Sequence, residues 1–165
     1  VVVGGNHDRC LERDRAFARR ALEPAVYLVD EGLTVDGLRI WGSPWQPWFL
    51  WGAFNLPRGR RLRERWAAIP AETGLLVTHT PPWGIRDRVT WWLPLAFSHV
   101  IGQGGRAGCA DLRAAVERIG PRLHVFGHIH EGHGTEDRGP TTFANAAVCD
   151  TAFRPANRPL LLDLP

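Results

Sequence analysis

Three apolar segments of the chain each run directly into side chains of the kind that bind metals or transfer protons. Residues 1–3, 75–78 and 123–126 are the segments, and the side chains that follow them are Asn6 and His7, His79, and His128 and His130. A Gly- or Pro-rich turn accompanies each group. If the segments are strands of a mainly parallel sheet, the residues that follow them gather at one edge of that sheet. The sequence therefore predicts that five such groups converge from distant parts of the chain.

His128 and His130 are the pair whose spacing points most clearly to metal binding. In extended backbone, residues two apart point to the same face, so both imidazoles could approach one metal ion or two adjacent ions. Neutral imidazole suits Zn²⁺, Mn²⁺ or Fe²⁺, and Asn6 can add an amide oxygen. His7 would point to the other side of an extended chain, so we expect it to act on a substrate.

The other histidines have plainer interpretations. His124 lies within an apolar segment, which favours a buried position in the core or behind a ligand. His99 lies in the irregular stretch 90–105, where we expect it to be exposed. His133 follows the pair by one turn and could face either the substrate or solvent.

The elements that must position these residues alternate along the chain. Amphipathic periodicity and Pro24 predict a helix over residues 9–22, and similar patterns predict helices over 56–69 and 111–119. Expected strands are residues 1–3, 26–29, 74–78, 122–126, 141–145 and 160–164, with a hairpin over 34–41 around Asp36-Gly37. Strands that alternate with helices indicate an α/β layered domain.

Composition limits the classes of function. The 165 residues are 44% hydrophobic and 22% charged, which suits one globular domain spanning residues 1–165. The net charge of +3 comes from dispersed arginines, so we expect no nucleic-acid groove. Three cysteines without a CxxC spacing favour a reducing compartment, the cytoplasm. No apolar run approaches the roughly 20 residues of a membrane helix, so we expect no membrane partner.

At these residues the sequence resembles the calcineurin-like metallophosphoesterases. Gly5-Asn-His-Asp8, His79 and Gly127-His-Ile-His130 match the last three motifs of that superfamily, in order. The match is closest to the metallophosphoesterase-domain-containing subgroup, which comprises class III-type phosphodiesterases. The stretches that carry it are Gly42-Ser-Pro-Trp-Gln-Pro-Trp-Phe49, Phe54-Asn-Leu-Pro-Arg-Gly59, Thr78-His-Thr-Pro-Pro-Trp-Gly84, His124-Val-Phe-Gly-His-Ile-His-Glu-Gly132 and Asn157-Arg-Pro-Leu-Leu-Leu-Asp-Leu-Pro165. The resemblance runs from residue 1 to residue 165, and only the stretch around 90–105 departs from it.

The resemblance implies a four-layer α-β-β-α sandwich with a site for two divalent metal ions (Mn²⁺, Fe²⁺ or Zn²⁺). Asn6, His79 and His128 would bind one metal and His130 the other. His7 would sit over the leaving group as general acid or phosphate stabiliser. Such a pair of metals clamps phosphoryl oxygens and supplies a hydroxide for in-line attack. The expected substrate is a small phosphoester or nucleotide, and a cyclic nucleotide or similar phosphodiester fits best.

One departure from the family pattern is severe. The first two family motifs, an Asp-x-His and a Gly-Asp, come before Gly-Asn-His and are absent here. We therefore expect a chain that lacks its N-terminal βαβ portion and holds at most one well-formed metal site. Two hypotheses follow: the chain is a fragment of a metal-dependent phosphodiesterase, or it is a complete, non-catalytic module that binds a metal or a nucleotide.

Four further residues are weaker candidates for the site. Trp45 and Trp48 could form a wall on which a base stacks, or a structural cover over the sandwich. Asp87 could orient a ligand histidine, as carboxylates do, or cap a helix or turn. Asn145 follows an expected strand, and the resemblance places it near the site without a defined role.

Overall fold

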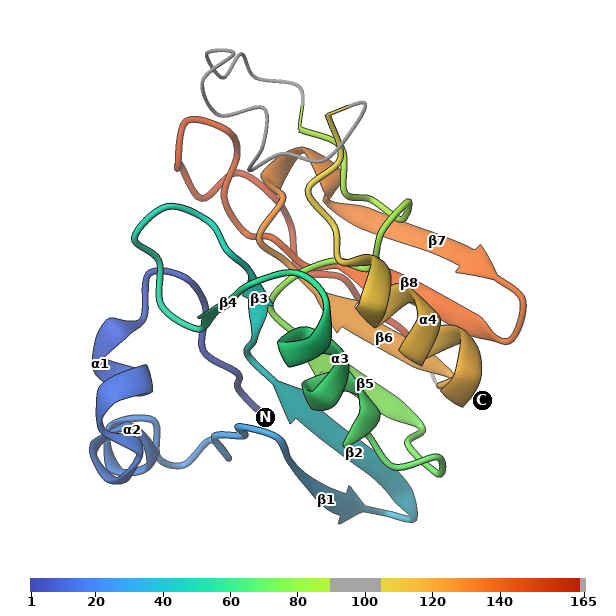
Figure 1. Cartoon of the computed structure of the whole chain (residues 1–165), viewed down its shortest axis with the longest axis horizontal. Coiled ribbons are helices and arrows are strands. Elements are labelled where there is room, and N and C mark those ends of the chain that lie inside the picture. Colours follow the sequence, from blue (N-terminus) through green and yellow to red (C-terminus); the bar gives the residue numbers. More distant parts are fainter. Residues whose placement is uncertain (90–104, 164–165) are drawn as a thin grey trace.

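The computed structural model describes residues 1–89 and 105–163, and its centre is a six-stranded sheet (Figure 1). The strand order across the sheet is β1 (Glu31–Val35), β2 (Leu38–Ser43), β5 (Leu75–Thr78), β6 (Leu123–Phe126), β8 (Thr141–Asn145) and β7 (Gly134–Arg138). The four central strands run parallel, and each edge strand pairs antiparallel with its neighbour. The carboxyl ends of β5 and β6 therefore meet at one edge of the sheet.

A hairpin forms one side of the sheet, as the Asp-Gly pair predicts. Asp36 and Gly37 join β1 to β2 with φ angles of 47° and 80°. A two-residue turn with both φ angles positive matches the twist of the flanking strands. A second hairpin, β7–β8, was not predicted, because β7 is half exposed and rich in charge.

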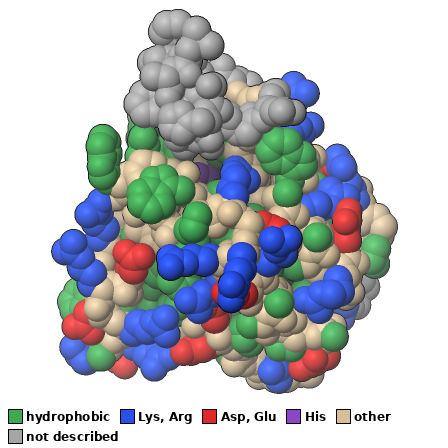
Figure 2. All heavy atoms as spheres, viewed as in Figure 1, with side chains coloured by type: hydrophobic (Ala, Val, Ile, Leu, Met, Phe, Trp, Pro, Cys, Tyr) green, Lys and Arg blue, Asp and Glu red, His purple; other side chains and the backbone are tan. Residues whose placement is uncertain are grey.

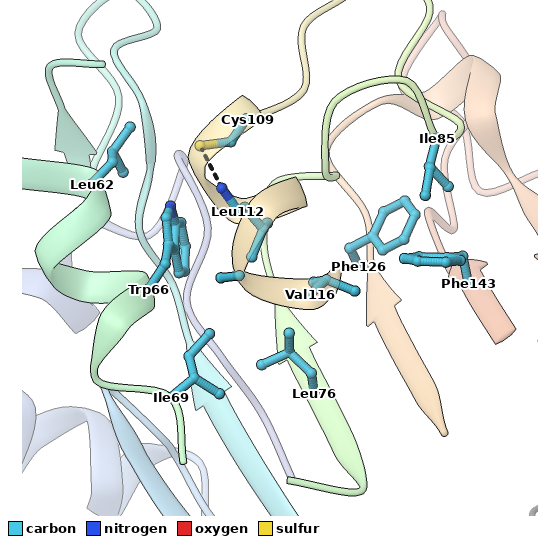
Figure 3. Close-up of a cluster of buried hydrophobic side chains, with 11 residues drawn as sticks. Leu62, Trp66, Ile69, Leu76, Ile85, Cys109, Leu112, Val116, Phe126 and Phe143 are labelled. Atoms are coloured by element: carbon cyan, nitrogen blue, oxygen red, sulfur yellow. Dashed lines mark hydrogen bonds between the residues drawn. The ribbon is translucent and has the colours of Figure 1, made fainter. Parts of the chain in front are cut away.

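Two helices, α3 (Arg60–Ala67) and α4 (Ala110–Ile119), cover one face of the sheet (Figure 1). Their buried residues Leu62, Trp66 and Leu112 pack with Leu76 of β5 and Phe126 of β6 in the main hydrophobic core (Figure 3). Burial of side chains this large is the main favourable term in folding. The core thus fixes β5 and β6, the two strands that lead to the histidines.

The N-terminal segment differs from the prediction. Residues 1–3 and 26–29 are not strands of the sheet but meet in one isolated parallel bridge between Val2 and Tyr27. Val2 N–H donates to the Val26 carbonyl and Leu28 N–H donates to the Val2 carbonyl, both at 2.9 Å. The expectation of strands at residues 1–3 and 26–29 is therefore wrong, because no described strand pairs with either segment over a longer register.

The helix predicted over residues 9–22 is two short helices, α1 (Arg9–Arg13) and α2 (Arg15–Ala21). Asp14 interrupts them because its backbone is extended and its carboxylate accepts a hydrogen bond from Phe17 N–H at 2.8 Å. This is an N-cap, a position that aspartate favours. Both helices lie beside the N-terminus and apart from α3 and α4 (Figure 1).

Other boundaries were shifted. The helix predicted from residue 56 begins at Arg60, after Gly59 at a φ of 97°, and residues 55–56 instead form β4 (Asn55–Leu56), which pairs with β3 (Gln46–Pro47). Residues 160–163 form no strand, and residue 164 lies outside the described part. The irregular stretch 90–105, with His99, also lies outside it except for Gly105.

The predicted α/β class is confirmed. The six-stranded sheet and the helical layer of α3 and α4 are two layers of the expected sandwich. Within the described ranges, no helix is long and apolar enough to cross a membrane. Basic and acidic side chains are interspersed on the face of the molecule that Figure 2 shows.

Candidate metal centre and active site

The loops that leave β5, β6 and the Val2 bridge bring three predicted ligands together. His79 follows β5 directly, His128 follows β6 by two residues, and Asn6 follows the Val2 bridge. Because β5 and β6 are parallel neighbours, their loops leave the sheet at the same edge. The N-terminal loop reaches this edge through Asn6, whose carbonyl accepts a hydrogen bond from Ala53 N–H at 2.8 Å.

The polar atoms of these three side chains converge. His79 Nε2 lies 2.8 Å from Asn6 Oδ1 and 3.0 Å from His128 Nδ1, and the two imidazole centroids are 4.7 Å apart. Two ligand atoms that each lie about 2.1 Å from a metal, at about a right angle, are themselves about 3 Å apart. The spacing of the donor set thus fits one divalent ion.

This donor set contains two imidazoles and one amide. Within residues 1–89 and 105–163, no three His, Cys, Asp or Glu side chains form a metal-binding group. The third donor of the cluster is therefore the neutral oxygen of Asn6, and no carboxylate joins the two histidines in such a group.

The backbone of His128 differs from the extended geometry expected for the pair. His128 has a φ of 68°, Ile129 is extended, and His130 starts the short 3-10 helix His130–Gly132. A left-handed backbone at a residue other than glycine is uncommon and occurs often at functional sites. This backbone turns the His128 ring toward His79. In an extended segment, the rings of His128 and His130 would instead lie on one shared face.

His130 lies beside this cluster and is held by a different contact. Its Nδ1 is 2.8 Å from the backbone carbonyl oxygen of Asp150, so Nδ1 carries the proton and donates it. The lone pair of the neutral ring is then on Nε2. Metal-ligating histidines commonly donate their other N–H in this way, which fixes the tautomer and the ring orientation.

Burial keeps the two central imidazoles neutral. It lowers the pKa of His79 well below the ordinary 6.5, and the nearby His128, His7 and His130 lower it further. Burial, with His130 and His7, lowers the pKa of His128 to about 4. Metal binding requires the neutral ring. Both side chains can therefore act as ligands at neutral pH without first losing a proton.

His124, directly behind the site, supports the His79 loop. The Thr78 hydroxyl donates to the Thr80 carbonyl at 2.8 Å, so its oxygen accepts from His124 Nε2–H at 2.9 Å. Burial alone lowers the pKa of His124 to about 3, and its Nδ1 has no hydrogen-bond partner among the described residues. The interpretation of His124 as a buried residue behind a ligand matches this position.

Asn145 holds the backbone between the two histidines of the pair. Its Nδ2 donates to the Ile129 carbonyl at 2.8 Å, and its Oδ1 accepts from Ala147 N–H at 3.0 Å. The side chain is fully buried at the end of β8, so it ties the His128–His130 segment to the sheet.

The cluster opens into a cavity of about 240 Å³. Of the predicted site residues, six line it: Asn6, His7, Trp48, His79, His128 and His130. The wall also contains Phe49 and Phe153, whose rings pack edge-on against His128 at 5.4 Å and His130 at 5.2 Å. Arg58 is the one arginine or lysine in the described lining, where it donates to the Gly108 carbonyl at 2.9 Å. The described lining is therefore mainly apolar and aromatic, with the imidazoles, Arg58 and Glu131 among its polar members.

Comparisons with known sequences and structures identify the family of this chain. The sequence model of the family "Calcineurin-like phosphoesterase" matches residues 1–132, which is most of the chain and includes Asn6, His79, His128 and His130. The chain belongs to the calcineurin-like phosphoesterase family. A hydrolase of the metallophosphoesterase type, dependent on divalent metals, is the general activity of that family.

Named relatives agree with the family. The chain is 48% identical over 145 residues to the human "Metallophosphoesterase domain-containing protein 1", covering 87% of this chain and 41% of the relative. It is 35% identical over 181 residues to "UPF0046 protein C25E10.12" of Caenorhabditis elegans, covering 100% of this chain and 61% of the relative. The chain thus spans less than half of the human relative's length. One solved crystal structure superposes with a TM-score of 0.59 at 20% identity, over 88% of this chain and 56% of its own, which supports the fold.

Four residues predicted for the phosphoesterase site lie outside the described cavity wall: Trp45, His133, Asp87 and Asn145. Trp45 donates its indole N–H to Asp30 Oδ2 at 2.7 Å and stacks under Arg65, whose guanidinium carbon is 4.5 Å from the ring centroid. His133 Nε2 lies 3.1 Å from the Arg158 carbonyl oxygen. Trp45 thus has the surroundings of a structural cover.

Asp87 is fully buried and organises a turn. Its carboxylate accepts from Gly84 N–H at 3.0 Å and Gly108 N–H at 3.3 Å, and it pairs with Arg106. These contacts match the turn interpretation, and none of them reaches a histidine.

Sequence reasoning missed most of the described wall, including Arg58 and Phe153. The sequence signal for Arg58 was its position in Phe54-Asn-Leu-Pro-Arg-Gly59, a stretch that resembles the family. Phe153 lies in a segment without periodicity and offered none.

Proposed function

We propose that this chain carries the leaving-group side and one metal site of a phosphodiesterase. The observation that carries the proposal is that His79 Nε2 lies within 3.0 Å of both Asn6 Oδ1 and His128 Nδ1, and that all three residues line one cavity. Membership of the family supports a metal-dependent phosphoesterase in general. The finer statement, a cyclic nucleotide or similar phosphodiester as substrate, is part of the proposal.

Each residue has a role in that proposal. Asn6, His79 and His128 hold one divalent ion, such as Mn²⁺, and His130 offers Nε2 to a second. When bound, such ions neutralise charge on the phosphoryl group and lower the pKa of water. His7 lines the same cavity and would donate a proton to the departing oxygen. A positioned general acid is worth about 10²–10⁴ in rate.

The apolar wall supports an ester with a flat group beside the phosphate. Trp48 is 60% exposed at the cavity, so its ring is available to stack on a base. Such stacking contributes about 1–3 kcal/mol per base.

The cysteines at 10, 109 and 149 are all free, which supports a cytoplasmic location.

A second candidate function is a module that binds a metal or nucleotide without hydrolysing an ester. It is favoured by the neutral donor set, because no Asp or Glu joins His79 and His128 in a metal-binding group of the described residues. A bridging carboxylate is a usual means of holding two metals close together.

Two measurements on the same metal-depleted protein test these proposals. Calorimetric titration with Mn²⁺ should show at least one site, and His128→Ala should weaken it at least ten-fold. Hydrolysis of bis(p-nitrophenyl) phosphate with Mn²⁺ should then fall about 100-fold in kcat for His7→Asn, with Mn²⁺ affinity unchanged. Metal binding without hydrolysis would support the module. Absence of metal binding would overturn both.

A further inference from the structure

The segment 148–157 folds around one carboxylate. Asp150 Oδ1 accepts from Ala152 N–H at 2.8 Å and Arg154 N–H at 3.0 Å, and Oδ2 pairs with the Arg154 guanidinium at 2.9 Å. Backbone hydrogen bonds join Asp150 N–H to the Arg154 carbonyl and Phe153 N–H to the Asp150 carbonyl. Asn157 Nδ2 closes the base of the segment by donating to the Ala147 carbonyl at 2.9 Å. We call residues 148–157 the Asp150 loop.

The Asp150 loop presents one aromatic ring to the site. Phe153 is 66% exposed, yet its ring packs edge-on against His130 at 5.2 Å and against His7 at 6.5 Å between centroids. Its φ is 59°, a left-handed backbone that is unfavourable for a bulky residue. Neither hydrophobic burial nor backbone preference accounts for a phenyl ring here. Residues held in such strain cluster at sites that contact ligands.

The same loop also fixes a predicted ligand. The Asp150 carbonyl that receives Phe153 N–H at 3.0 Å also receives His130 Nδ1–H at 2.8 Å. One carbonyl therefore links the orientation of the His130 ring to the position of the Phe153 ring. Movement of this turn would displace both.

We propose that the Asp150 loop is the specificity element of the site. Phe153 contacts a flat aromatic group attached to the phosphoryl group, and Asp150 is the positioning residue that holds Phe153 there. This inference rests on the proposed function, because it assumes that the phosphoryl group binds beside His128 and His130. The ring lies between His7, which would protonate the leaving group, and His130.

The surroundings favour an aromatic group over an extended polar one. Val148, Ala147 and Phe49 are apolar members of the same wall, which also contains Glu131, and Trp48 is exposed in that wall. Phenyl rings prefer offset or edge-to-face partners, with a gain beyond the area that they bury. An aliphatic ester would bury less surface here and would gain no ring contact.

The test measures binding rather than turnover, with two anions that differ only in the ring. Phenylphosphonate and methylphosphonate are titrated calorimetrically into the Mn²⁺-loaded protein. The unsubstituted protein should bind phenylphosphonate roughly five- to ten-fold more tightly, from the usual worth of a ring contact. Phe153→Ala should remove that preference and leave the methylphosphonate affinity within two-fold. Phe153→Trp should retain it.

Phe17→Ala is the matched control. Phe17 is 43% exposed on α2 and is not part of the cavity wall, so its loss should leave the preference unchanged. Equal affinity for the two anions in the unsubstituted protein, binding of neither, or a preference that survives Phe153→Ala would each overturn the proposal. A ring preference without hydrolysis of any ester would overturn the phosphodiesterase and leave this inference standing.

Asp150 is tested by rescue. Asp150→Asn keeps an Oδ1 acceptor for the two backbone N–H groups, whereas Asp150→Ala removes it. The alanine variant should lose the ring preference like Phe153→Ala, and the asparagine variant should keep most of it. In addition, the ¹⁵N shifts of His130 should show a single Nδ1–H tautomer in the unsubstituted and asparagine proteins and a mixture in the alanine protein. Identical preferences in all three proteins would rule out a positioning role for Asp150.

Discussion

The Cα atom of Gly5 lies directly against the imidazole of His79. A Cβ atom at this position would lie 2.6 Å from Cε1 and 2.7 Å from Nδ1 of that ring, closer than any ordinary contact. The ring has no room to retreat, because it is also placed between Asn6 and His128. The glycine of the Gly-Asn-His motif therefore sets the position of a predicted ligand that lies far away in the sequence.

This contact predicts a loss of metal affinity in Gly5→Ala. The added methyl group should push His79 out of the cluster and weaken Mn²⁺ binding at least ten-fold, as measured by calorimetric titration. Gly127→Ala is the matched control within the site, because its Cβ would meet nothing nearer than 4.0 Å. We expect its metal affinity to stay within two-fold. Equal losses in the two variants would contradict the steric explanation.

Alanine variants of Trp45 and Trp48 should separate an effect on stability from an effect on substrate binding. Trp45 packs against Phe54 and Arg65 and donates to Asp30, so Trp45→Ala should lower the free energy of unfolding by about 2–4 kcal/mol. Trp48 is largely exposed in the cavity wall, so Trp48→Ala should cost less than about 0.5 kcal/mol and raise KM for a nucleotide more than for a small phosphodiester.

Chemical denaturation and steady-state kinetics check both tryptophan variants. Trp51→Ala is the control, since Trp51 is 80% exposed and is not part of the described cavity wall. It should change neither quantity. A larger KM effect for Trp45→Ala than for Trp48→Ala would contradict the assignment.

Buried His124 predicts a pH dependence of stability. Its pKa is about 3 in the folded protein, against an ordinary value of 6.5. Between these values the unfolded chain binds a proton that the folded chain does not, so stability falls as the pH falls from about 6.5 toward 3. The slope from one such group approaches about 1.4 kcal/mol per pH unit.

His124→Gln keeps a side-chain N–H for the Thr78 hydroxyl and removes the titrating ring. Urea denaturation at a series of pH values should show a shallower loss of stability below pH 6.5 in this variant than in the unsubstituted protein. Above that pH the two curves should run parallel. The same acid slope in both proteins would show that His124 is not among the groups responsible.

Asn145 predicts a coupled loss of stability and activity. Asn145→Ala would leave the buried Ile129 carbonyl and Ala147 N–H without their partner, at about 1–3 kcal/mol for each unsatisfied group. It should also reduce kcat, because Ile129 lies between His128 and His130. Thr142→Ala on the same strand removes an exposed hydroxyl bonded to Asp137, and it should leave both thermal unfolding and kcat nearly unchanged.

The convergence of the ligands could be predicted because it follows from buried parallel strands. β5 and β6 are short, apolar and covered by α3 and α4, so their carboxyl ends had to meet, and His79 and His128 with them. The left-handed backbone of His128 could not be read in the same way. No local pattern encodes it, and the next residue, Ile129, is held by a hydrogen bond from Asn145 on another strand.

Other differences have similar causes. The strand expected at residues 1–3 is apolar enough, but strand formation needs a partner, and in the described part it finds Tyr27 in a single bridge. The Asp150 loop depends on one carboxylate that receives two N–H groups, which sequence periodicity does not reveal. Trp45 and Trp48 have the same type and neighbouring positions, and only the packing tells them apart.

The isolated Val2–Tyr27 bridge has a thermodynamic consequence for the N-terminal segment. One bridge is a weak attachment, whereas an ion shared by Asn6, His79 and His128 would tether this segment to the loops of the central sheet. Ligand binding to the native state alone adds to its stability by mass action. Metal binding would then order the N-terminal segment locally. The amide hydrogens around residues 2–8 would exchange slowly with solvent only when the ion is present.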